Sequence, residues 1–121
     1  MADLRDILVV KGRWCSVWYA SRPNGSRLAE LFYVSLKRME QAQLITLFKR
    51  ISDEGKIHNR TKFKQVEGDI FEFKTRSGVR IGCYQDDRRW FLLDGFHKAS
   101  VYWPKGKVLH MQQLLVEHRG R

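Results

Sequence analysis

The amino-acid sequence predicts an α+β fold with the element order β-α-α-β-β-β-α. Two apolar stripes with helical spacing lie in the first half, and three segments rich in β-branched and aromatic residues follow them. A proline then opens a last amphipathic segment. We therefore expect a small, mainly antiparallel sheet packed against two N-terminal helices, with a C-terminal helix. The length of 121 residues predicts a single domain, residues 1–121, that buries about two thirds of its unfolded surface.

The first strand is expected at residues 13–20 (RWCSVWYA), which are rich in aromatic and β-branched side chains. Residues 1–12 form an N-terminal extension for which the pattern predicts no element. A turn-forming segment follows the strand, and Ser26 at its end is the expected N-cap of the next helix.

The two apolar stripes are out of phase. A step of five residues, from Met39 to Leu44, would put them about 140° apart on one straight helix. Two helices with a break near residues 40–43 would let both stripes face one sheet, and Gly55 would end the second helix. The stripes consist of Leu28, Leu31, Phe32, Leu36 and Met39, and of Leu44, Leu47, Phe48 and Ile51.

Residues 56–68 are polar and basic and are expected to form a connector. Strands are then predicted at residues 69–75, 79–85 and 89–95, the first two joined by a three-residue loop with Gly78 in the left-handed conformation. This register sets Lys74 opposite Arg80, whereas a two-residue turn would mix the polar and apolar faces. The core face would carry Phe71, Phe73, Val79, Ile81 and Cys83, and the solvent face Glu72, Lys74, Arg80, Gly82 and Tyr84.

The last strand and the last helix complete the predicted fold. Residues 90–93 are apolar on both faces of their strand, which predicts a central or well-covered position. Pro104 stands where a first helical position is expected, so a helix should cover residues 105–118. The better apolar face of that helix comprises Val108, Leu109, Met111, Gln112, Leu115 and Val116.

The charge is the most informative bulk property. The chain has 23 Lys and Arg against 13 Asp and Glu, which gives a formal net charge of +10. Residues 1–60 carry 11 basic and 6 acidic side chains and residues 61–121 carry 12 and 7, so the whole domain is basic. Such an excess predicts nucleic acid or an acidic protein as the partner, with an anionic membrane as a third option.

Several classes of protein are excluded. No apolar run approaches the ~18 residues of a membrane span, and the N-terminus has no signal-peptide pattern, so a cytoplasmic protein is expected. The two cysteines, Cys15 and Cys83, lie far apart in apolar segments. Because the histidines are also dispersed, we expect neither a metal site nor a cofactor. The histidines are His58, His97, His110 and His118.

The basic residues of the second half could act on RNA. Lys74 directly opposite Arg80 is unfavourable unless Glu72 or a polyanion offsets the two charges. Metal-free RNA cleavage needs a base for the 2′-OH, an acid for the leaving oxygen and a cation for the phosphorane. Arg80 suits the cation, a lysine with a lowered pKa the base, and His97 or Tyr84 the acid. The catalytic candidates are Arg80, Lys74, His97 and Tyr84, and the RNA-binding candidates are Lys62, Lys64, Arg76 and Lys98.

Plainer explanations exist for most of these residues. A histidine after a strand is more often a hydrogen-bonded loop residue than a catalyst. Tyr84 at a strand end is about as often a packing residue, and Lys62 and Lys64 fit simple solvated charge. Only Arg80, between Val79 and Ile81 within a strand, is explained better by function than by structure.

Three segments resemble consecutive motifs of one protein family. They are residues 68–74 (GDIFEFK), 79–84 (VRIGCY) and 91–98 (FLLDGFHK), followed by the helix after Pro104. Together they resemble the HigB-like, phage-derived branch of the RelE/ParE toxin superfamily over about residues 14–118. The sequence departs from that pattern at Ala99, where a second lysine is usual, and at residues 101–103 (VYW).

The resemblance implies a RelE-like toxin that cleaves mRNA on the ribosome without a metal and is neutralised by a cognate antitoxin. By position it carries over Arg80 from the second of these strands and Lys74 from the end of the first, where arginine is more usual. It also carries over Lys62 and Lys64 before the sheet, and His97 with Lys98 after the last strand. From the charge we expect an acidic antitoxin segment that covers the Lys74 and Arg80 face or wraps the helices.

Other functions remain open from the sequence. A ParE-like inhibitor of DNA gyrase would share the fold without nuclease chemistry. A non-catalytic double-stranded-RNA-binding module is also basic, but the extra strand and the paired helices argue against it. A third alternative is an inactive protein on the same scaffold, since function depends on the site and not on the fold.

Overall fold

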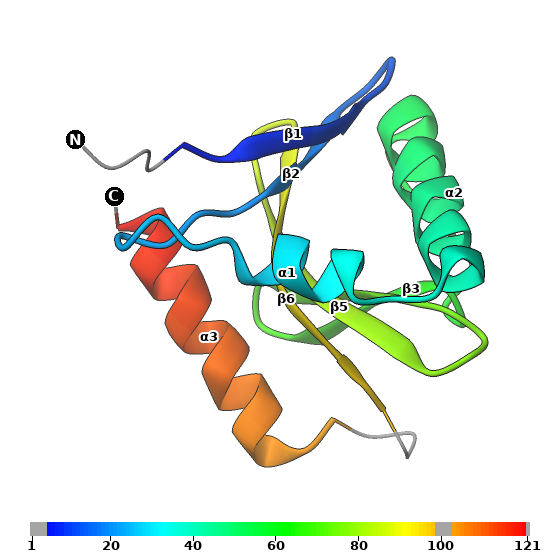
Figure 1. The fold of residues 1–121 in the computed structure, drawn as a ribbon. Coiled ribbons are helices and arrows are strands. Elements are labelled where there is room, and N and C mark those ends of the chain that lie inside the picture. Colours follow the sequence, from blue (N-terminus) through cyan, green and yellow to red (C-terminus); the bar gives the residue numbers. More distant parts are fainter. Residues whose placement is uncertain (1–4, 99–102, 121) are drawn as a thin grey trace.

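The computed structural model describes residues 5–98 and 103–120. Within them lies one six-stranded sheet with the strand order β1-β2-β6-β5-β4-β3, in which β2 and β6 run parallel and all other neighbours antiparallel. Along the chain (Figure 1) the elements are β1 (Ile7–Lys11), β2 (Ser16–Tyr19), α1 (Leu28–Val34), α2 (Arg38–Glu54), β3 (Phe63–Glu67), β4 (Ile70–Lys74), β5 (Val79–Asp86), β6 (Arg89–His97) and α3 (Lys105–Arg119).

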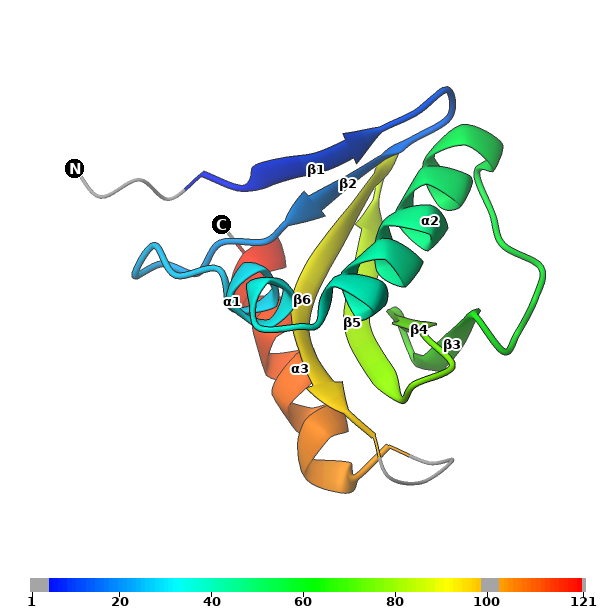
Figure 2. The same cartoon turned by 45° about the vertical axis from the view of Figure 1, so that its right-hand side comes forward.

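The sheet is covered on both faces. Helices α1 and α2 lie on one face and α3 on the other (Figure 2). Successive side chains of each strand therefore enter two different cores. The first core joins α2 to Phe73, Val79, Ile81 and Cys83, and the second joins α3 to Ile70, Tyr84, Phe91, Leu93 and Phe96. Burying one such side chain fully contributes roughly 1.5–3 kcal/mol.

The predicted hairpin register is confirmed. Lys74 pairs with Arg80 and Glu72 with Gly82, and the Thr75 N–H donates to the Val79 carbonyl at 3.0 Å. Gly78 has φ +96°, the left-handed conformation that the three-residue loop requires. The expected stripe of α2 is buried as well, and the left-handed Gly55 ends that helix.

Two strands were missed, so the predicted order β-α-α-β-β-β-α is wrong. Strand β1 lies in the expected extension and pairs with β2, and β3 lies in the expected connector and pairs with β4. Strand β3 occupies an edge of the sheet, where polar side chains are tolerated on the open side. Of its residues only Phe63 is buried, stacked on Phe71 with the ring centroids 5.6 Å apart. One buried residue in five is too weak a pattern to predict a strand.

The break between the helices lies at residues 35–37 and not at the predicted residues 40–43. The Glu40 carboxylate accepts a hydrogen bond from the Lys37 N–H at 3.1 Å, which stabilises the first turn of α2. The earlier break divides the first stripe: Leu36 and Phe32 pack against the core, whereas Met39 and Leu31 are 71% and 60% exposed. Ser26 does not cap α1, because its hydroxyl donates to Asn24 Oδ1 and the N-cap is Arg27.

The sheet face that was expected to meet solvent is covered by α3. Glu72 and Tyr84 are 0% and 1% exposed. Gly82 permits this close approach, because a Cβ there would lie 2.7 Å from Met111 Sδ. Residues 99, 101 and 102, where the sequence departs from the family pattern, lie outside the described residues.

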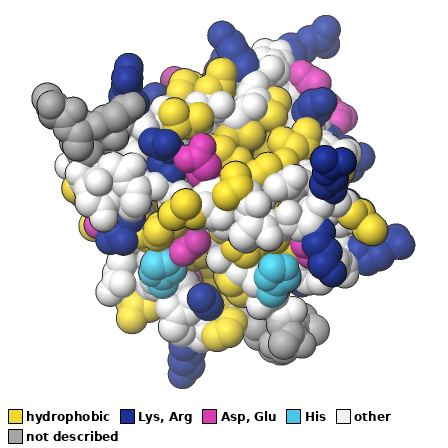
Figure 3. Space-filling model, in the orientation of Figure 1, with side chains coloured by type: hydrophobic (Ala, Val, Ile, Leu, Met, Phe, Trp, Pro, Cys, Tyr) yellow, Lys and Arg dark blue, Asp and Glu magenta, His cyan; other side chains and the backbone are white. Residues whose placement is uncertain are grey.

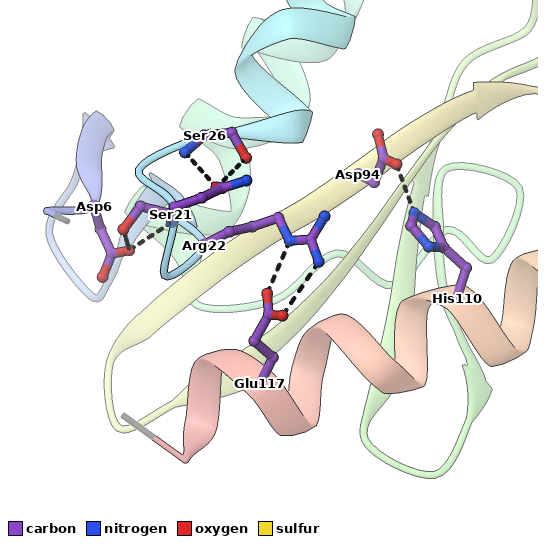
Figure 4. A network of polar contacts seen from close by, with 8 residues as sticks. Asp6, Ser21, Arg22, Ser26, Asp94, His110 and Glu117 are labelled. Carbon is purple, nitrogen blue, oxygen red and sulfur yellow. Dashed lines mark hydrogen bonds and ion pairs between the residues drawn. The ribbon is translucent and has the colours of Figure 1, made fainter. Parts of the chain in front are cut away.

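Polar contacts fix the rotation of α3 about its axis. Glu117 accepts two hydrogen bonds from Arg22, at 2.9 and 3.2 Å, and His110 Nε2 lies 2.8 Å from Asp94 Oδ2 (Figure 4). The buried residues of α3 are Met111, Leu114, Leu115 and His118. The predicted face is therefore only partly correct, and its Leu109 and Val116 are 55% and 68% exposed. Among the described residues, no helix has both the length and the apolar character needed to cross a membrane.

Two glycine substitutions should have opposite effects on stability. A Cβ at Gly95 of β6 would lie 2.1 Å from Phe32 Cδ2, so Gly95→Ala should push α1 away and destabilise the protein by roughly 1–3 kcal/mol. Gly106, in the first turn of α3, has no heavy atom within 4 Å of such a Cβ, so Gly106→Ala should stabilise by about 0.5–1 kcal/mol. Urea unfolding followed by circular dichroism measures both. Equal midpoints for the two variants would contradict the packing of α1 on β6.

Candidate functional site

A buried carboxylate organises the cationic end of the sheet. Glu72 Oε1 accepts a hydrogen bond from Trp103 Nε1 at 2.7 Å and lies 3.3 Å from Arg80 Nε, while Oε2 lies 3.7 Å from Lys64 Nζ. A carboxylate removed from water is tolerated only when cations and hydrogen-bond donors surround it. Glu72 thus holds three side chains from β3, β5 and the segment before α3 in one place.

Arg80 is held from two sides. Its Nη1 donates to the Val79 carbonyl at 3.1 Å and, more weakly, to the Thr75 carbonyl at 3.4 Å. Its Nε faces Glu72, and only 13% of the side chain is exposed. The guanidinium is therefore preorganised beside the hairpin loop, and it needs little reordering to meet an anion.

The charges of Glu72 and Arg80 also act on Lys74 and Lys98. Burial lowers the pKa of Lys74, and the nearby cations Lys64 and Arg80 lower it further against the opposing effect of Glu72. Burial also lowers the pKa of Lys98, which Glu72 opposes and Arg80 reinforces. We call this group the Glu72 cluster: Glu72, Lys64, Lys74, Arg80, Lys98 and Trp103. Four cations around one carboxylate leave a positive excess in a partly dehydrated place.

Two more of the predicted RNA-binding residues lie next to this cluster. Lys62 and Arg76 line a pocket between α2 and the β4–β5 hairpin, and Lys74 lines it as well. The Lys74 N–H donates to the Lys62 carbonyl at 2.9 Å, which places the ends of β3 and β4 side by side. Lys64, Lys74, Arg80 and Lys98 lie around Glu72 on the α3 face of the sheet, and Lys62 and Arg76 line the pocket beside α2, so the six cations gather around the end of β4.

His97 does not lie beside Arg80. His97 pairs with Val79, whose side chain enters the core of α1 and α2, whereas Arg80 pairs with Phe96 on the α3 face. Neighbouring residues of a strand point to opposite faces. His97 Nε2 lies 3.5 Å from Glu40 Oε2, and its ring contacts Phe32.

Tyr84 is also separated from the cluster. It lies four residues along β5 from Arg80, about 13 Å at the usual rise of a strand. Its hydroxyl is buried and hydrogen-bonded to His118 Nδ1, and His118 Nε2 bonds to Asp6 Oδ1 at 2.9 Å. Asp6 also accepts a bond from the Ser21 N–H (Figure 4), so this chain of contacts ties the residue before β1 to the end of α3.

Sequence reasoning missed two residues on this side of the molecule. Trp103 was noted only as a departure from the family pattern, yet its indole N–H binds Glu72 and its ring packs on Phe96 at 4.9 Å. Arg50 of α2 lines the pocket with Lys62 and Arg76. The available signal was its spacing, because Gln43, Thr46 and Arg50 form a polar row beside the buried stripe of α2.

Metal ligands do not gather in the part of the chain that the structure describes. No group of three or more His, Cys, Asp or Glu side chains there is arranged to hold a metal ion. Both cysteines are buried and unpaired, and burial raises the pKa of each thiol.

One protein family matches most of the chain. The profile of the family described as Phage derived protein Gp49-like matches residues 32–115, from within α1 to within α3. The matched region contains β3 to β6, all six gathered cations and Trp103. No curated protein matches the chain.

Changes in the Glu72 cluster should move the pKa of Lys74 in opposite directions. The charge of Glu72 raises that pKa, so Glu72→Gln, which keeps an acceptor for Trp103, should lower it further. Lys64 lowers it, so Lys64→Gln should raise it. NMR titration of the 13C-labelled lysine side chain measures both shifts. Lys49→Gln on the exposed side of α2 is the control. An unchanged pKa of Lys74 in Glu72→Gln would show that Lys74 lies outside the field of Glu72.

Proposed function

Because the chain belongs to the family of phage-derived Gp49-like proteins, which lies in the RelE toxin-like group, we propose that it is the toxin of a type II toxin–antitoxin system. Its proposed activity is ribosome-dependent, metal-independent cleavage of mRNA. The observation that supports this activity most directly is the Glu72 cluster, where a fixed arginine and two lysines of lowered pKa lie together. These groups can bind a phosphodiester and move its protons without a metal.

The chemistry assigns one step to each group. Neutral Lys74 takes the proton of the 2′-OH, and the 2′-oxygen attacks the adjacent phosphorus. Arg80 stabilises the added charge of the pentavalent phosphorane, and its planar guanidinium suits two oxygens at once. Protonated Lys98 gives a proton to the 5′-oxygen as the P–O5′ bond breaks. The products are a 2′,3′-cyclic phosphate and a 5′-hydroxyl, and DNA is spared because it lacks the 2′-OH.

The lowered pKa values suit these two roles. A lysine of ordinary pKa is almost fully protonated at neutral pH and is a poor base. Lowering the pKa of Lys74 increases its neutral fraction, so kcat/KM should rise with pH through that pKa. Lowering the pKa of Lys98 makes its ammonium a stronger acid. His97 and Tyr84 take no step in this scheme, because both lie away from the cluster.

We also propose that the partner is an antitoxin whose acidic segment binds over the Glu72 cluster. The cluster carries excess positive charge, and the chain as a whole carries +10. The face that carries α1 and α2, opposite the α3 face, offers the antitoxin a second contact. Figure 3 shows apolar side chains gathered there over β1, α1 and α2 among Lys and Arg. The exposed ones there are Ile7, Leu8, Leu31, Val34 and Met39.

Arg80→Ala should abolish toxicity. Removing one group that stabilises transition-state charge costs about 10²–10³-fold in rate, so primer extension on mRNA from induced cells should lose its cleavage stops. Arg88→Ala removes an equally charged, exposed side chain at the β5–β6 turn and should remain toxic. Growth arrest with intact mRNA would point to DNA gyrase instead. Unimpaired growth with the wild-type chain would favour the RNA-binding or inactive alternatives.

Antitoxin binding should protect the cluster lysines. In the complex, Lys74 and Lys98 should react more slowly with an amine-specific reagent than in the free toxin, while exposed Lys49 and Lys105 should not change. Mass spectrometry of the labelled peptides measures the four rates. An antitoxin that neutralises the protein and leaves Lys74 and Lys98 fully reactive contradicts the proposed acidic contact.

A further inference from the structure

A cationic pocket lies beside the Glu72 cluster. It has a volume of about 310 Å³ and opens between α2 and the β4–β5 hairpin. Its charged lining side chains are all cations, because no Asp or Glu lines it. This size suits part of a nucleotide. The lining residues are Arg50, Lys62, Lys74, Arg76, Gln43, Thr46, Leu47 and Thr75.

The fold assembles these charges from distant parts of the sequence. Arg50 lies in the last turns of α2, Lys62 precedes β3, Lys74 ends β4, and Arg76 lies in the hairpin loop. Arg50 Nε lies 4.0 Å from Oε2 of exposed Glu54, a separation at which an exposed ion pair contributes little. Bringing four cations together raises the free energy of the folded state unless an anion offsets their repulsion.

The pocket meets the proposed catalytic site at the end of β4. Lys74 lines the pocket, and the Glu72 cluster acts on the pKa of the same side chain. Thr75 also lines the pocket, and its carbonyl accepts the weak hydrogen bond from Arg80 Nη1. The side chain of Arg80 lies on the α3 face of the sheet and the pocket on the α2 face, so an RNA strand that occupies both must pass around the hairpin loop at Thr75 and Arg76.

We propose that this pocket is a second RNA subsite, which binds the backbone phosphate and ribose of a nucleotide next to the one held at Arg80. The proposal rests on the proposed function and adds Arg50 to the residues that bind the substrate. Arg50 and Arg76 pair with the phosphate oxygens, as guanidinium groups do with such anions. Gln43 Oε1 is buried without a hydrogen-bond partner among the described residues, and the Thr46 hydroxyl, which donates to the Ala42 carbonyl, can still accept, so these two residues supply neutral polar groups for ribose hydroxyls. An acidic antitoxin segment could use the arginines, but it has less use for the neutral groups.

Salt dependence of RNA binding tests the subsite. The logarithm of the binding constant for a single strand falls with the logarithm of salt concentration by about 0.7 per phosphate neutralised. The double variant Arg50→Ala, Arg76→Ala should therefore lose about 0.7 from the slope of wild type. When the protein cleaves mRNA bound to the ribosome, the double variant should have a raised KM with little change in kcat, because the subsite binds the substrate away from the reacting phosphate.

The matched control removes two positive charges from α2 outside the pocket. Arg38 and Lys49 are exposed residues of α2 that do not line the pocket, so Arg38→Ala, Lys49→Ala also lowers the net charge by two. Fluorescence anisotropy with a labelled oligouridine, at several sodium chloride concentrations, measures the slopes of wild type and both variants. Circular dichroism melting shows that each variant is folded.

The outcomes separate the subsite from the proposed function. A smaller slope and a raised KM in the pocket variant alone support the subsite. Equal slopes in the two double variants overturn it, and if Arg80→Ala still abolishes cleavage, the proposed function stands without it. If wild type neither cleaves RNA nor binds the oligouridine, the proposed function fails and the subsite with it. If the pocket variant binds and cleaves RNA like wild type but is no longer inhibited by the antitoxin, the pocket binds the antitoxin and the proposed RNA subsite is wrong.

Discussion

The carboxylate of Glu72 lies on the α3 face of the sheet, where no part of it is exposed to water. A single charge in such a place costs several kcal/mol unless it is paired. Lys64 and Arg80 provide the pairing, and Trp103 provides a hydrogen bond. The cations also depend on Glu72. Lys74 lies directly opposite Arg80, and the negative charge of Glu72 offsets the repulsion between these two side chains. The position of α3 also depends on this group, since Trp103 precedes the helix and covers Glu72.

The two ends of β5 differ because α3 crosses only part of the sheet. At the Tyr84 end, His118 and Asp6 close the surface with a buried chain of hydrogen bonds. At the Arg80 end, the helix has not yet begun, and the lysines of the Glu72 cluster reach the surface beside the hairpin loop. The same sheet face is therefore a packed core at one end and a cationic site at the other. The pKa values of Lys74 and Lys98 are lowered by partial burial and by the neighbouring cations, and the same crowding of like charges favours the binding of an anion.

Much of the local structure could be predicted from the sequence, because it depends on short-range physics. The loop length and Gly78 set the hairpin register, so Lys74 was correctly paired with Arg80. The 3.6-residue period set the buried stripe of α2. Prediction failed where the local pattern was weak. The polar edge strand β3 buries one residue strongly, and the break before α2 depends on a capping contact of Glu40 that the apolar spacing does not contain.

The amino-acid sequence alone shows which residue types the site has to offer, because Lys and Arg are in large excess in both halves of the chain and two of them lie on strands whose register is predictable. It also determined that Lys74 and Arg80 are neighbours, because cross-strand pairing follows from alternation and the turn. Which of the remaining candidates join them depends on the three-dimensional packing. It brought Arg50 to Arg76, and it separated His97 and Tyr84 from Arg80. The reason is that these meetings depend on how helices pack and rotate against the sheet, and that packing is settled by contacts between residues far apart in the chain.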